Sequence, residues 1–228
     1  IDGQRGEEII ARSKAGMIVF KYASGSWRQL TTSGPLADSS GWGSSPSYYT
    51  TIQTGEIDGQ PGADLIARGG QGVVVLRWNG GGWTLTVDSR LYPDPGYADP
   101  QFYTVMQVAD VVGDRKQELI AREDAGLVAL AVRNGKLVRV DKGNGPFAQI
   151  TGLPDCPMTG SRGSCFGGAP AYYGTIQLAD VDGDRRAEAL GRAPDGLRVR
   201  NNAGGTGWPG LPGLADLSDA NGWDVQKR

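Results

Sequence analysis

Closely spaced carboxylates are the residues of this chain whose types and spacing could do chemistry. The segment DVDGDRRAE has the pattern Asp-x-Asp-x-Asp-x-x-x-Glu and contains Asp180, Asp182, Asp184 and Glu188. Carboxylates at alternate positions of a tight loop converge on one point, and oxygen ligands without His or Cys select a hard cation. An irregular loop of this size suits Ca²⁺ better than Mg²⁺, and the main-chain carbonyl of Arg186 could add a ligand. The pattern predicts a calcium site, with a solvated acidic turn as the alternative.

The same loop recurs three times earlier in the chain with fewer carboxylates. The four copies start at residues 1, 57, 111 and 181 and read IDGQRGEEIIAR, IDGQPGADLIAR, VVGDRKQELIAR and VDGDRRAEALGR. The third copy keeps Asp110, Asp114 and Glu118, but Val112 takes the middle position, so this loop is a weaker calcium candidate. In the first two copies a glutamine replaces the third carboxylate, and we expect hydrogen bonds to backbone amides to hold those loops.

An arginine ends every copy of this motif. These residues are Arg12, Arg68, Arg122 and Arg192. The last three are candidate ligand contacts, because a guanidinium binds a carboxylated or polyhydroxylated ligand through two parallel hydrogen bonds. The alternative is that each arginine makes an internal pair with a loop carboxylate or with a glutamine of the adjoining strand. A residue that is repeated in every unit usually belongs to the construction of the fold, which favours this second interpretation.

Three aromatic residues follow a glycine in loops that are rich in Gly, Pro and Asp. They are Trp42, Tyr97 and Trp223. An aromatic ring in such a loop can stack against the apolar face of a pyranose. Clefts between repeated sheets also suit small polar ligands. We therefore predict that these rings are sugar contacts, with packing inside the fold as the alternative.

The elements that position these residues follow from the internal repeat. One repeat unit cannot bury its apolar face alone and must stack on its neighbours. The second unit predicts strands at Tyr48–Ile57, Ala63–Arg68, Gly72–Trp78 and Trp83–Val87. Short strands separated by Gly, Asn and Asp turns are typical of all-β proteins. We predict an all-β fold, a β-propeller of four-stranded blades, whose single domain 1–228 comprises units at about 1–40, 41–94, 95–150 and 151–216 and the start of a further unit at 217–228.

Composition excludes several classes of function. The net charge is −2 and there is no basic run, which argues against nucleic-acid binding through phosphate contacts. No apolar stretch is long enough to span a bilayer, so we expect no membrane insertion. The chain contains no histidine, which removes the Ser-His-Asp and Cys-His arrangements, and no nucleophile is paired with a base. We therefore expect a protein that is not an enzyme.

The two cysteines indicate a cellular compartment. Cys156 and Cys165 lie in the insertion LPDCPMTGSRGSCFGG, which makes the third spacing between copies the longest. We predict a local disulfide that closes a surface loop of a secreted protein. The alternative is a pair of free thiols in a cytosolic chain. A zinc site is disfavoured, because two cysteines without histidine supply too few soft ligands.

The repeated Asp-x-Asp-Gly-Asp motif followed by an apolar strand resembles the FG-GAP (VCBS-type) β-propeller repeat over nearly the whole chain. The pairs Gly41-Trp42, Gly96-Tyr97 and Gly222-Trp223 and the final segment LSDANGWDVQKR are similar to the segment between blades in the seven-bladed FG-GAP lectins of fungi. The resemblance implies binding of N-acetylglucosamine-type sugars between neighbouring blades. The Phe-Gly strand end of those lectins is replaced here by Ala-Arg or Gly-Arg, so their individual sugar contacts are not carried over.

Two classes of function follow. The first is a secreted, calcium-containing, carbohydrate-binding propeller that recognises glycans or glycoproteins. The second is a non-catalytic propeller for protein interaction or adhesion, or an accessory domain of a secreted enzyme. The first repeat unit lacks the strand that opens the others, and an unpaired sheet edge invites pairing. We therefore expect another chain or fragment to complete the ring, which the resemblance suggests has seven blades.

Overall fold

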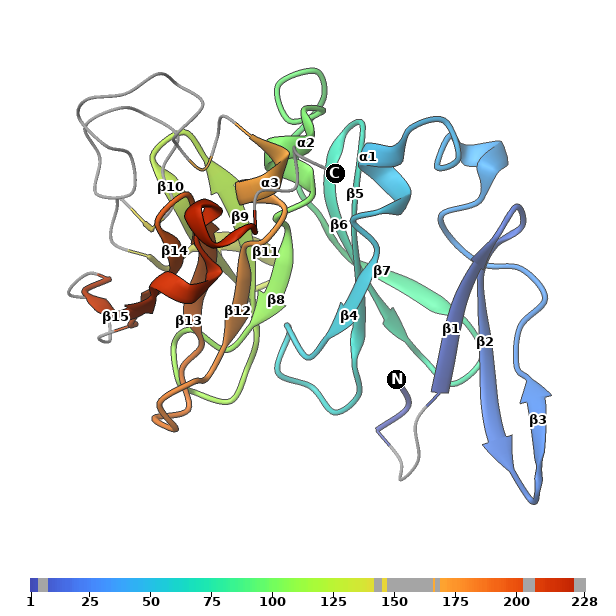
Figure 1. Cartoon of the computed structure of the whole chain (residues 1–228). Coiled ribbons are helices and arrows are strands. Elements are labelled where there is room, and N and C mark those ends of the chain that lie inside the picture. The colour runs from blue at the N-terminus through green and yellow to red at the C-terminus, as the bar shows by residue number, and fades with distance from the viewer. Residues whose placement is uncertain (4–7, 142–144, 147–165, 167–168, 203–207, 224–228) are drawn as a thin grey trace. The chain divides into compact units, whose positions relative to one another are not determined.

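The computed structural model describes residues 1–3, 8–141, 145–146, 166, 169–202 and 208–223. In this part of the chain the strands form four antiparallel sheets, three of four strands and one of three (Figure 1). Strands that follow one another in the sequence are neighbours in every sheet. This strand order is the one expected of a propeller blade. It confirms the predicted all-β fold of repeated sheets.

Each sheet corresponds to one copy of the repeat. Sheet 1 contains β1 (Glu8–Ser13), β2 (Gly16–Ala23) and β3 (Ser26–Gln29). Sheet 2 contains β4 (Gln53–Gly55), β5 (Asp64–Gly69), β6 (Gly72–Trp78) and β7 (Trp83–Asp88). Sheet 3 contains β8 (Gln107–Ala109), β9 (Glu118–Glu123), β10 (Gly126–Arg133) and β11 (Lys136–Arg139). Sheet 4 contains β12 (Gln177–Ala179), β13 (Glu188–Ala193), β14 (Gly196–Arg200) and β15 (Gly210–Leu214).

The described chain divides into two compact units, each built on two of the sheets. Unit 1 comprises Ile1–Ala98 with Val132–Leu137, and unit 2 comprises Asp99–Ala131 with Val138–Arg228. Sheets 1 and 2 belong to unit 1. Sheet 4 and most of sheet 3 belong to unit 2. The predicted pairing of each repeat with a neighbour is therefore present inside each unit.

Apolar side chains from two sheets share a core in each unit. In unit 1, Met17 of β2 and Leu65 of β5 belong to one buried cluster. In unit 2, Ile120 of β9 and Ala189 of β13 belong to another. Removal of this apolar surface from water is the main force that holds each pair of sheets together. The core is thus shared between blades rather than gathered at one centre.

The second strands of sheets 2 and 3 are buried along almost their whole length. In β5 every residue except Gly69 is buried, and in β9 every residue except Glu123. Burial of both strand faces explains why these segments read as continuous apolar runs instead of alternating patterns. Both strands nevertheless begin at a carboxylate and contain an arginine. Charged groups at buried positions need partners, and these partners form the candidate site.

The aromatic pairs that precede each first strand adopt a helical turn, which corrects the predicted strand at Tyr48–Ile57. Four-residue helices occur at α1 (Pro46–Tyr49), α2 (Pro100–Tyr103) and α3 (Pro170–Tyr173). Each has proline at the first helical position, where a missing N–H does no harm. The side chains of Ser45 and Asp99 cap α1 and α2 by accepting hydrogen bonds from backbone amides. The helix start signal outweighs the β propensity of the tyrosines.

Three short 3₁₀ turns complete the described elements. They are η1 (Asp38–Ser40), η3 (Ala215–Leu217) and η4 (Asp219–Asn221). In the described residues of unit 1, sheet 1 has three strands and no counterpart of β4. Cys156 and Cys165, and with them the predicted disulfide, lie outside the described residues.

Candidate functional site

The predicted calcium ligands lie in the loop between the first two strands of sheet 4. We call the four equivalent segments loop 1 (1–8), loop 2 (56–64), loop 3 (110–118) and loop 4 (180–188). In loop 4, one carboxylate oxygen each from Asp180, Asp182 and Glu188 lie within 4.8 Å of one another. Nowhere else in the described residues do three acidic, His or Cys side chains converge in this way. An all-oxygen donor set of this kind fits a hard cation such as Ca²⁺.

Backbone amides position two of these carboxylates. Asp180 accepts hydrogen bonds from the amide of Gly183 at 2.7 Å and from that of Arg185 at 3.0 Å. Glu188 is buried and accepts from the amide of Val181 at 2.9 Å. These bonds fix the loop without any ion, which is the behaviour of a hydrogen-bonded acidic turn. They also leave carboxylate lone pairs that a cation could share.

Asp182 belongs to the convergent group, whereas Asp184 does not. Asp182 accepts a hydrogen bond from the amide of Asp184 at 3.1 Å and from Nδ2 of Asn201 at 2.8 Å. Asp184 instead accepts from the amide of Arg186 at 2.8 Å, and its carboxylate lies 3.8 Å from the Arg186 guanidinium. The structure therefore brings together three of the four predicted side-chain ligands of loop 4.

Loop 3 repeats the backbone hydrogen bonds of loop 4 but lacks its convergence of carboxylates. Asp110 accepts from the amide of Gly113 at 2.6 Å and from that of Arg115 at 2.8 Å, as Asp180 does in loop 4. Asp114 accepts from the amide of Lys116 at 3.0 Å. The two loops have the same backbone pattern, and they differ in the side chain at the middle position.

The carboxylates at the ends of loops 2 and 3 are costly to ionise. Burial raises the pKa of the Glu118 carboxyl to about 7, although the amides of Val111 and Val112 oppose the rise. Burial likewise raises the pKa of Asp64 to about 6, and the amide of Ile57 opposes it. Desolvation disfavours the charged form, and a nearby positive charge favours it. These loops would therefore gain from a cation close to them.

Loops 1 and 2 have such a cation within the chain. Lys21 of β2 lies 3.3 Å from the buried carboxylate of Glu8. Arg77 of β6 forms an ion pair with Asp58. Lys21 lies in β2 and Arg77 in β6, which are equivalent strands of their two repeats. In loop 2 the predicted hydrogen bonding to backbone amides, from Ile57 and Asp58 to Asp64, is thus joined by an ion pair.

The repeated arginines are turned toward the protein. Arg68 is completely buried, donates from Nε to the carbonyl of Tyr92 at 2.7 Å and forms an ion pair with Asp94. It also donates to the carbonyl of Ser47 at 3.3 Å. The hydroxyl of Tyr48 donates to the other oxygen of Asp94. The arginine thus ties the second strand of its sheet to the loop that follows the sheet.

The same cluster recurs in sheet 4. Arg192 donates from Nε to the carbonyl of Leu217 at 3.1 Å and forms an ion pair with Asp219. The hydroxyl of Tyr172 donates to Asp219 at 2.7 Å, and the Arg192 guanidinium lies 5.6 Å from the centre of the Tyr172 ring. This geometry repeats the cluster of Arg68, with a cation–π contact added.

The other two arginines keep parts of this cluster. Arg12 donates to the carbonyl of Leu36 at 3.2 Å and pairs with Asp38. Arg122 is buried and donates to the carbonyl of Phe166 at 3.2 Å, and its burial lowers the pKa of the guanidinium to about 10. Internal partners of all four arginines favour the interpretation in which they belong to the construction of the fold.

The three loop aromatics differ in exposure. Trp42 packs against the core cluster of unit 1 and makes an edge contact with Tyr48, with ring centres 6.1 Å apart. Tyr97 is partly buried and makes an edge contact with Tyr92 at 4.7 Å. Trp223 is 54% exposed. Among the three, Trp223 has the ring most open to a ligand.

Sequence reasoning missed the aspartates that precede these aromatic residues. They are Asp38, Asp94 and Asp219, and each pairs with the arginine of its own repeat. Their side chains remain between 27% and 40% exposed, whereas Arg68 and Arg192 are buried. The signal was present in the sequence, because an aspartate stands two or three residues before Gly-Trp or Gly-Tyr each time.

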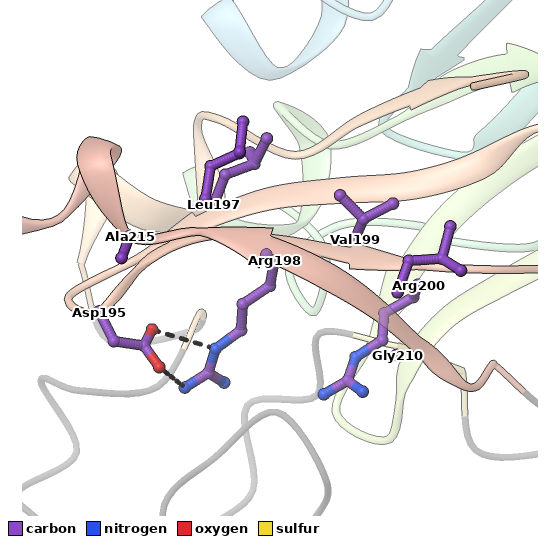
Figure 2. A pocket seen from close by; sticks show the side chains of 10 residues that line it. Asp195, Leu197, Arg198, Val199, Arg200, Gly210 and Ala215 are labelled. Carbon is purple, nitrogen blue, oxygen red and sulfur yellow. Dashed lines mark hydrogen bonds and ion pairs between the residues drawn. The ribbon is translucent and has the colours of Figure 1, made fainter. Parts of the chain in front are cut away.

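A separate hollow of about 520 Å³ lies along β14 and β15. Arg198 and Arg200 extend from the same side of β14 into this region (Figure 2). Arg198 is bound by Asp195 through two hydrogen bonds of 3.2 and 3.1 Å. None of the site residues predicted from the sequence lines this hollow.

Comparison with known proteins supports the fold. The sequence matches no protein-family model and no curated protein sequence. Among solved structures it is similar to a lectin of Agrocybe aegerita described as specifically recognising non-reducing terminal N-acetylglucosamine, with a TM-score of 0.69 and 17% sequence identity. That match covers 98% of this chain and 53% of the lectin, so the chain spans about half of the lectin's length.

A second match is more distant. It is to the Photorhabdus luminescens Tc holotoxin pore, with a TM-score of 0.49 and 17% identity over 91% of this chain and 9% of that one. Among the described residues, no helix has the length and apolar character that a membrane crossing requires. The likeness to the solved lectin, together with the four sheets, shows an all-β fold of the propeller type.

Proposed function

We propose that this chain is a non-catalytic, carbohydrate-binding propeller that recognises glycans or glycoproteins. Its candidate binding loops each contain an aspartate followed by an aromatic residue. A carboxylate can accept hydrogen bonds from two neighbouring sugar hydroxyls, and bonds to a charged acceptor are the stronger kind. The aromatic ring offers a flat apolar face to the pyranose. Together these two groups form the minimum of a shallow sugar site.

The observation that carries this proposal is the environment of Trp223. Its indole is 54% exposed and follows Asp219 by four residues. Arg192 and Tyr172 bind Asp219 from inside the protein, so its carboxylate is fixed in place before a ligand arrives. Preorganisation of this kind reduces the entropy that is lost on binding.

The other two loops repeat this arrangement with less exposed rings. Trp42 follows Asp38, and Tyr97 follows Asp94. We assign the predicted arginine contacts, Arg68, Arg122 and Arg192, a supporting role, because their donors bind carbonyls and aspartates of the chain. The solved lectin of similar fold, described as recognising N-acetylglucosamine, supports a sugar of that type as the first ligand to examine.

A glycan array tests the proposal with two matched tryptophan variants. Trp223 and Trp27 are both 54% exposed, but Trp27 packs on Tyr22 in the β2–β3 hairpin, away from any repeated aspartate. We expect Trp223→Ala to weaken the affinity of its own site about tenfold, which corresponds to the loss of about 1.4 kcal/mol, and to reduce binding to the array by more than this, while Trp27→Ala binds as the unchanged protein does. Equal binding by both variants, or no binding of the unchanged protein to any glycan, contradicts the proposal.

We also propose that loop 4 binds Ca²⁺ through Asp180, Asp182 and Glu188. The donor set supports this, because three carboxylate oxygens meet there and the neighbouring donor is the neutral amide of Asn201. Loop 3, with Asp110, Asp114 and Glu118, and the further ligands Asp184 and Arg186 stay secondary candidates. The role of the ion would be to fasten the loop, and ligand binding to the folded state alone stabilises it.

A melting experiment tests the calcium proposal. Asp182→Ala should lower the melting temperature in calcium and remove most of the difference between calcium and chelator. Asp88→Ala, which changes an exposed carboxylate at the end of β7, should leave that difference intact. A melting curve of the unchanged protein that is the same in calcium and in chelator contradicts the proposal.

The alternative function is protein interaction or adhesion, or service as the accessory domain of a secreted enzyme. A glycan array without any binding would favour it over the lectin proposal. Secretion rests on the two cysteines and on the family resemblance. The FG-GAP resemblance and a further chain or fragment that completes the ring remain part of the same proposal.

A further inference from the structure

Four equivalent strands, β2, β6, β10 and β14, each open with the glycine of a tight hairpin. The residue five positions after that glycine differs from repeat to repeat and lies within the strand or, in repeat 4, directly after it. In order of the repeats, this residue is Lys21, Arg77, Ala131 and Asn201. The first two repeats therefore place a positive charge where the last two place a neutral side chain.

In repeat 2 the positive charge lies against two buried carboxylates. Arg77 forms an ion pair with Asp58, whose side chain is 7% exposed. The Nε atom of Arg77 also lies 3.8 Å from the carboxylate of Asp64. Asp58 stands at the same place of loop 2 as Asp182 does in loop 4. Asp64 likewise corresponds to Glu188, and both accept hydrogen bonds from the amide at the second position of their loop.

Repeat 1 has the same arrangement with a different basic residue. The Lys21 ammonium pairs with Asp2 and lies 3.3 Å from one oxygen of Glu8, whose other oxygen pairs with the ammonium of Ile1 at 2.6 Å. Its charged form is favoured, because the hydrogen bond to Asp2 raises the pKa of Lys21. A lysine in repeat 1 and an arginine in repeat 2 thus contact the same pair of loop positions. The two side chains share a positive charge but not a shape, which indicates that the charge is what the loop carboxylates need.

In the described parts of repeats 3 and 4, the position equivalent to Lys21 and Arg77 carries no basic residue. Ala131 has no polar group, and Asn201 donates a neutral amide hydrogen bond to Asp182 at 2.8 Å. Arg186 lies 3.8 Å from Asp184, outside the convergent group, and its Nε donates to the carbonyl of Val112 in loop 3 at 3.3 Å. Among the described residues, neither Asp182 nor Glu188 of loop 4 has a basic side chain as a partner.

We propose that Lys21 and Arg77 are built-in counter-cations that make loops 1 and 2 independent of a divalent cation and confine any metal dependence to loops 3 and 4. The inference builds on the calcium proposal for loop 4, but the role of Arg77 does not depend on it. It assigns the two repeats of unit 1 a stability that chelators do not change. It also predicts that one substitution can convert a loop that depends on a divalent cation into one that is independent of it.

The first arm of the test removes the charge from loop 2 in the full chain and in chelator. Arg77→Gln should lower the melting temperature by roughly 2–4 °C, because the buried carboxylates lose their counter-charge. Arg77→Lys should recover most of this loss. Arg133→Gln removes an equally basic residue from an exposed position of β10 and should have no effect. If Arg77→Gln has the same melting temperature as the unchanged protein, or if Arg77→Lys melts no higher than Arg77→Gln, the proposal is wrong.

The second arm adds the charge to loop 4. Asn201→Lys should raise the melting temperature in chelator. It should also reduce the shift in melting temperature caused by CaCl₂ to less than half of that in the unchanged protein. Asn201→Ala should not raise the melting temperature in chelator. An Asn201→Lys protein that is no more stable in chelator than the alanine variant contradicts the proposal. Absence of a calcium shift in the unchanged protein would refute the calcium site alone, since both arms are also measured in chelator.

Discussion

Arg68 and Asp94 illustrate how single residues hold this fold together. A fully buried guanidinium is tolerated here because two carbonyls and one carboxylate accept its hydrogen bonds. Charge-assisted bonds of this kind are stronger than neutral ones. Arg192 and Asp219 repeat the pair in another sheet. The repeated arginine therefore locks a second strand to the loop that carries the candidate sugar-binding aromatic residue.

The first prediction concerns Asp94 and pH. Burial alone would raise the pKa of its carboxyl, but hydrogen bonds from Tyr48 and Arg68 lower it below the usual value. The folded state therefore favours the ionised form, so its contribution is complete above the unfolded pKa of about 3.9 and is lost as the pH falls through the folded value. Asp94→Asn should reduce the free energy of unfolding by about 2 kcal/mol at pH 7.

Urea unfolding at several pH values checks this prediction. The difference between the unchanged protein and Asp94→Asn should shrink below about pH 4, where Asp94 of the unfolded chain begins to gain a proton before the folded one does. Asp195→Asn is the matched control, because its carboxylate is 67% exposed and its pair with Arg198 contributes little. A difference that stays constant down to pH 2 would mean that the charge of Asp94 is unimportant.

At the scale of the element, a tight hairpin with a glycine of positive φ opens one strand of every sheet, namely β2, β6, β10 and β14. Gly72 has a φ of +127°, and a Cβ atom built on it would lie 2.2 Å from the carbonyl oxygen of Ser89. Gly126 has the same conformation and the same close approach to a carbonyl. Only glycine combines a positive φ with the absence of a side chain. The hairpin sets the register that delivers Arg77 to loop 2.

The second prediction follows from this close approach. Gly72→Ala should lower the free energy of unfolding by at least ~2 kcal/mol, since it adds both backbone strain and a clash with a main-chain atom that cannot move aside. Gly81→Ala is the control, because nothing lies within 4 Å of the added methyl group in the β6–β7 turn. Thermal unfolding compares the two. A Gly72→Ala protein as stable as the control would show that the hairpin can relax.

Strands were predictable from the sequence, whereas the turns between them were predicted less well. Continuous apolar runs such as Gly72–Trp78 mark buried strands, and the predicted bounds of that strand are confirmed. Tyr48 and Tyr49 were assigned to a strand from their β propensity, but the Ser45 cap and the following proline begin a helix there. Local capping signals extend over only a few residues, so strand propensity over a longer window conceals them.

For the candidate site, the residue types were predictable from the sequence, but their partners were not. The pattern around Asp180 predicted convergence, and three of its four carboxylates do converge. The recurring spacing before Gly-Trp or Gly-Tyr marks Asp94 as a repeated residue, but it does not identify Arg68, which lies far away in the chain, as its partner. The position of Arg77 against Asp58 also depends on strand register. Long-range pairs of this kind need the folded sheet before they can be recognised.

At the scale of the whole molecule, repetition changes how binding should be measured. Three loops carry an aspartate and an aromatic residue, namely those with Trp42, Tyr97 and Trp223. Each shallow site alone should bind a free sugar weakly, because few groups contact it. Linked sites raise the effective concentration at a glycan-coated surface and multiply apparent affinity roughly 10²–10⁴-fold where the geometry allows simultaneous contact.

The third prediction is therefore a difference between two measurements on the same variant. Trp223→Ala should reduce binding to a densely coated glycan surface far more than about tenfold, because the loss of one site removes its share of avidity as well as its own affinity. Titration with a free monosaccharide should show only the smaller change. Trp27→Ala should alter neither measurement, since Trp27 lies outside the repeated loops. Equal losses on the surface and in solution would mean that the chain binds through one site and that the repeats serve only to build the fold.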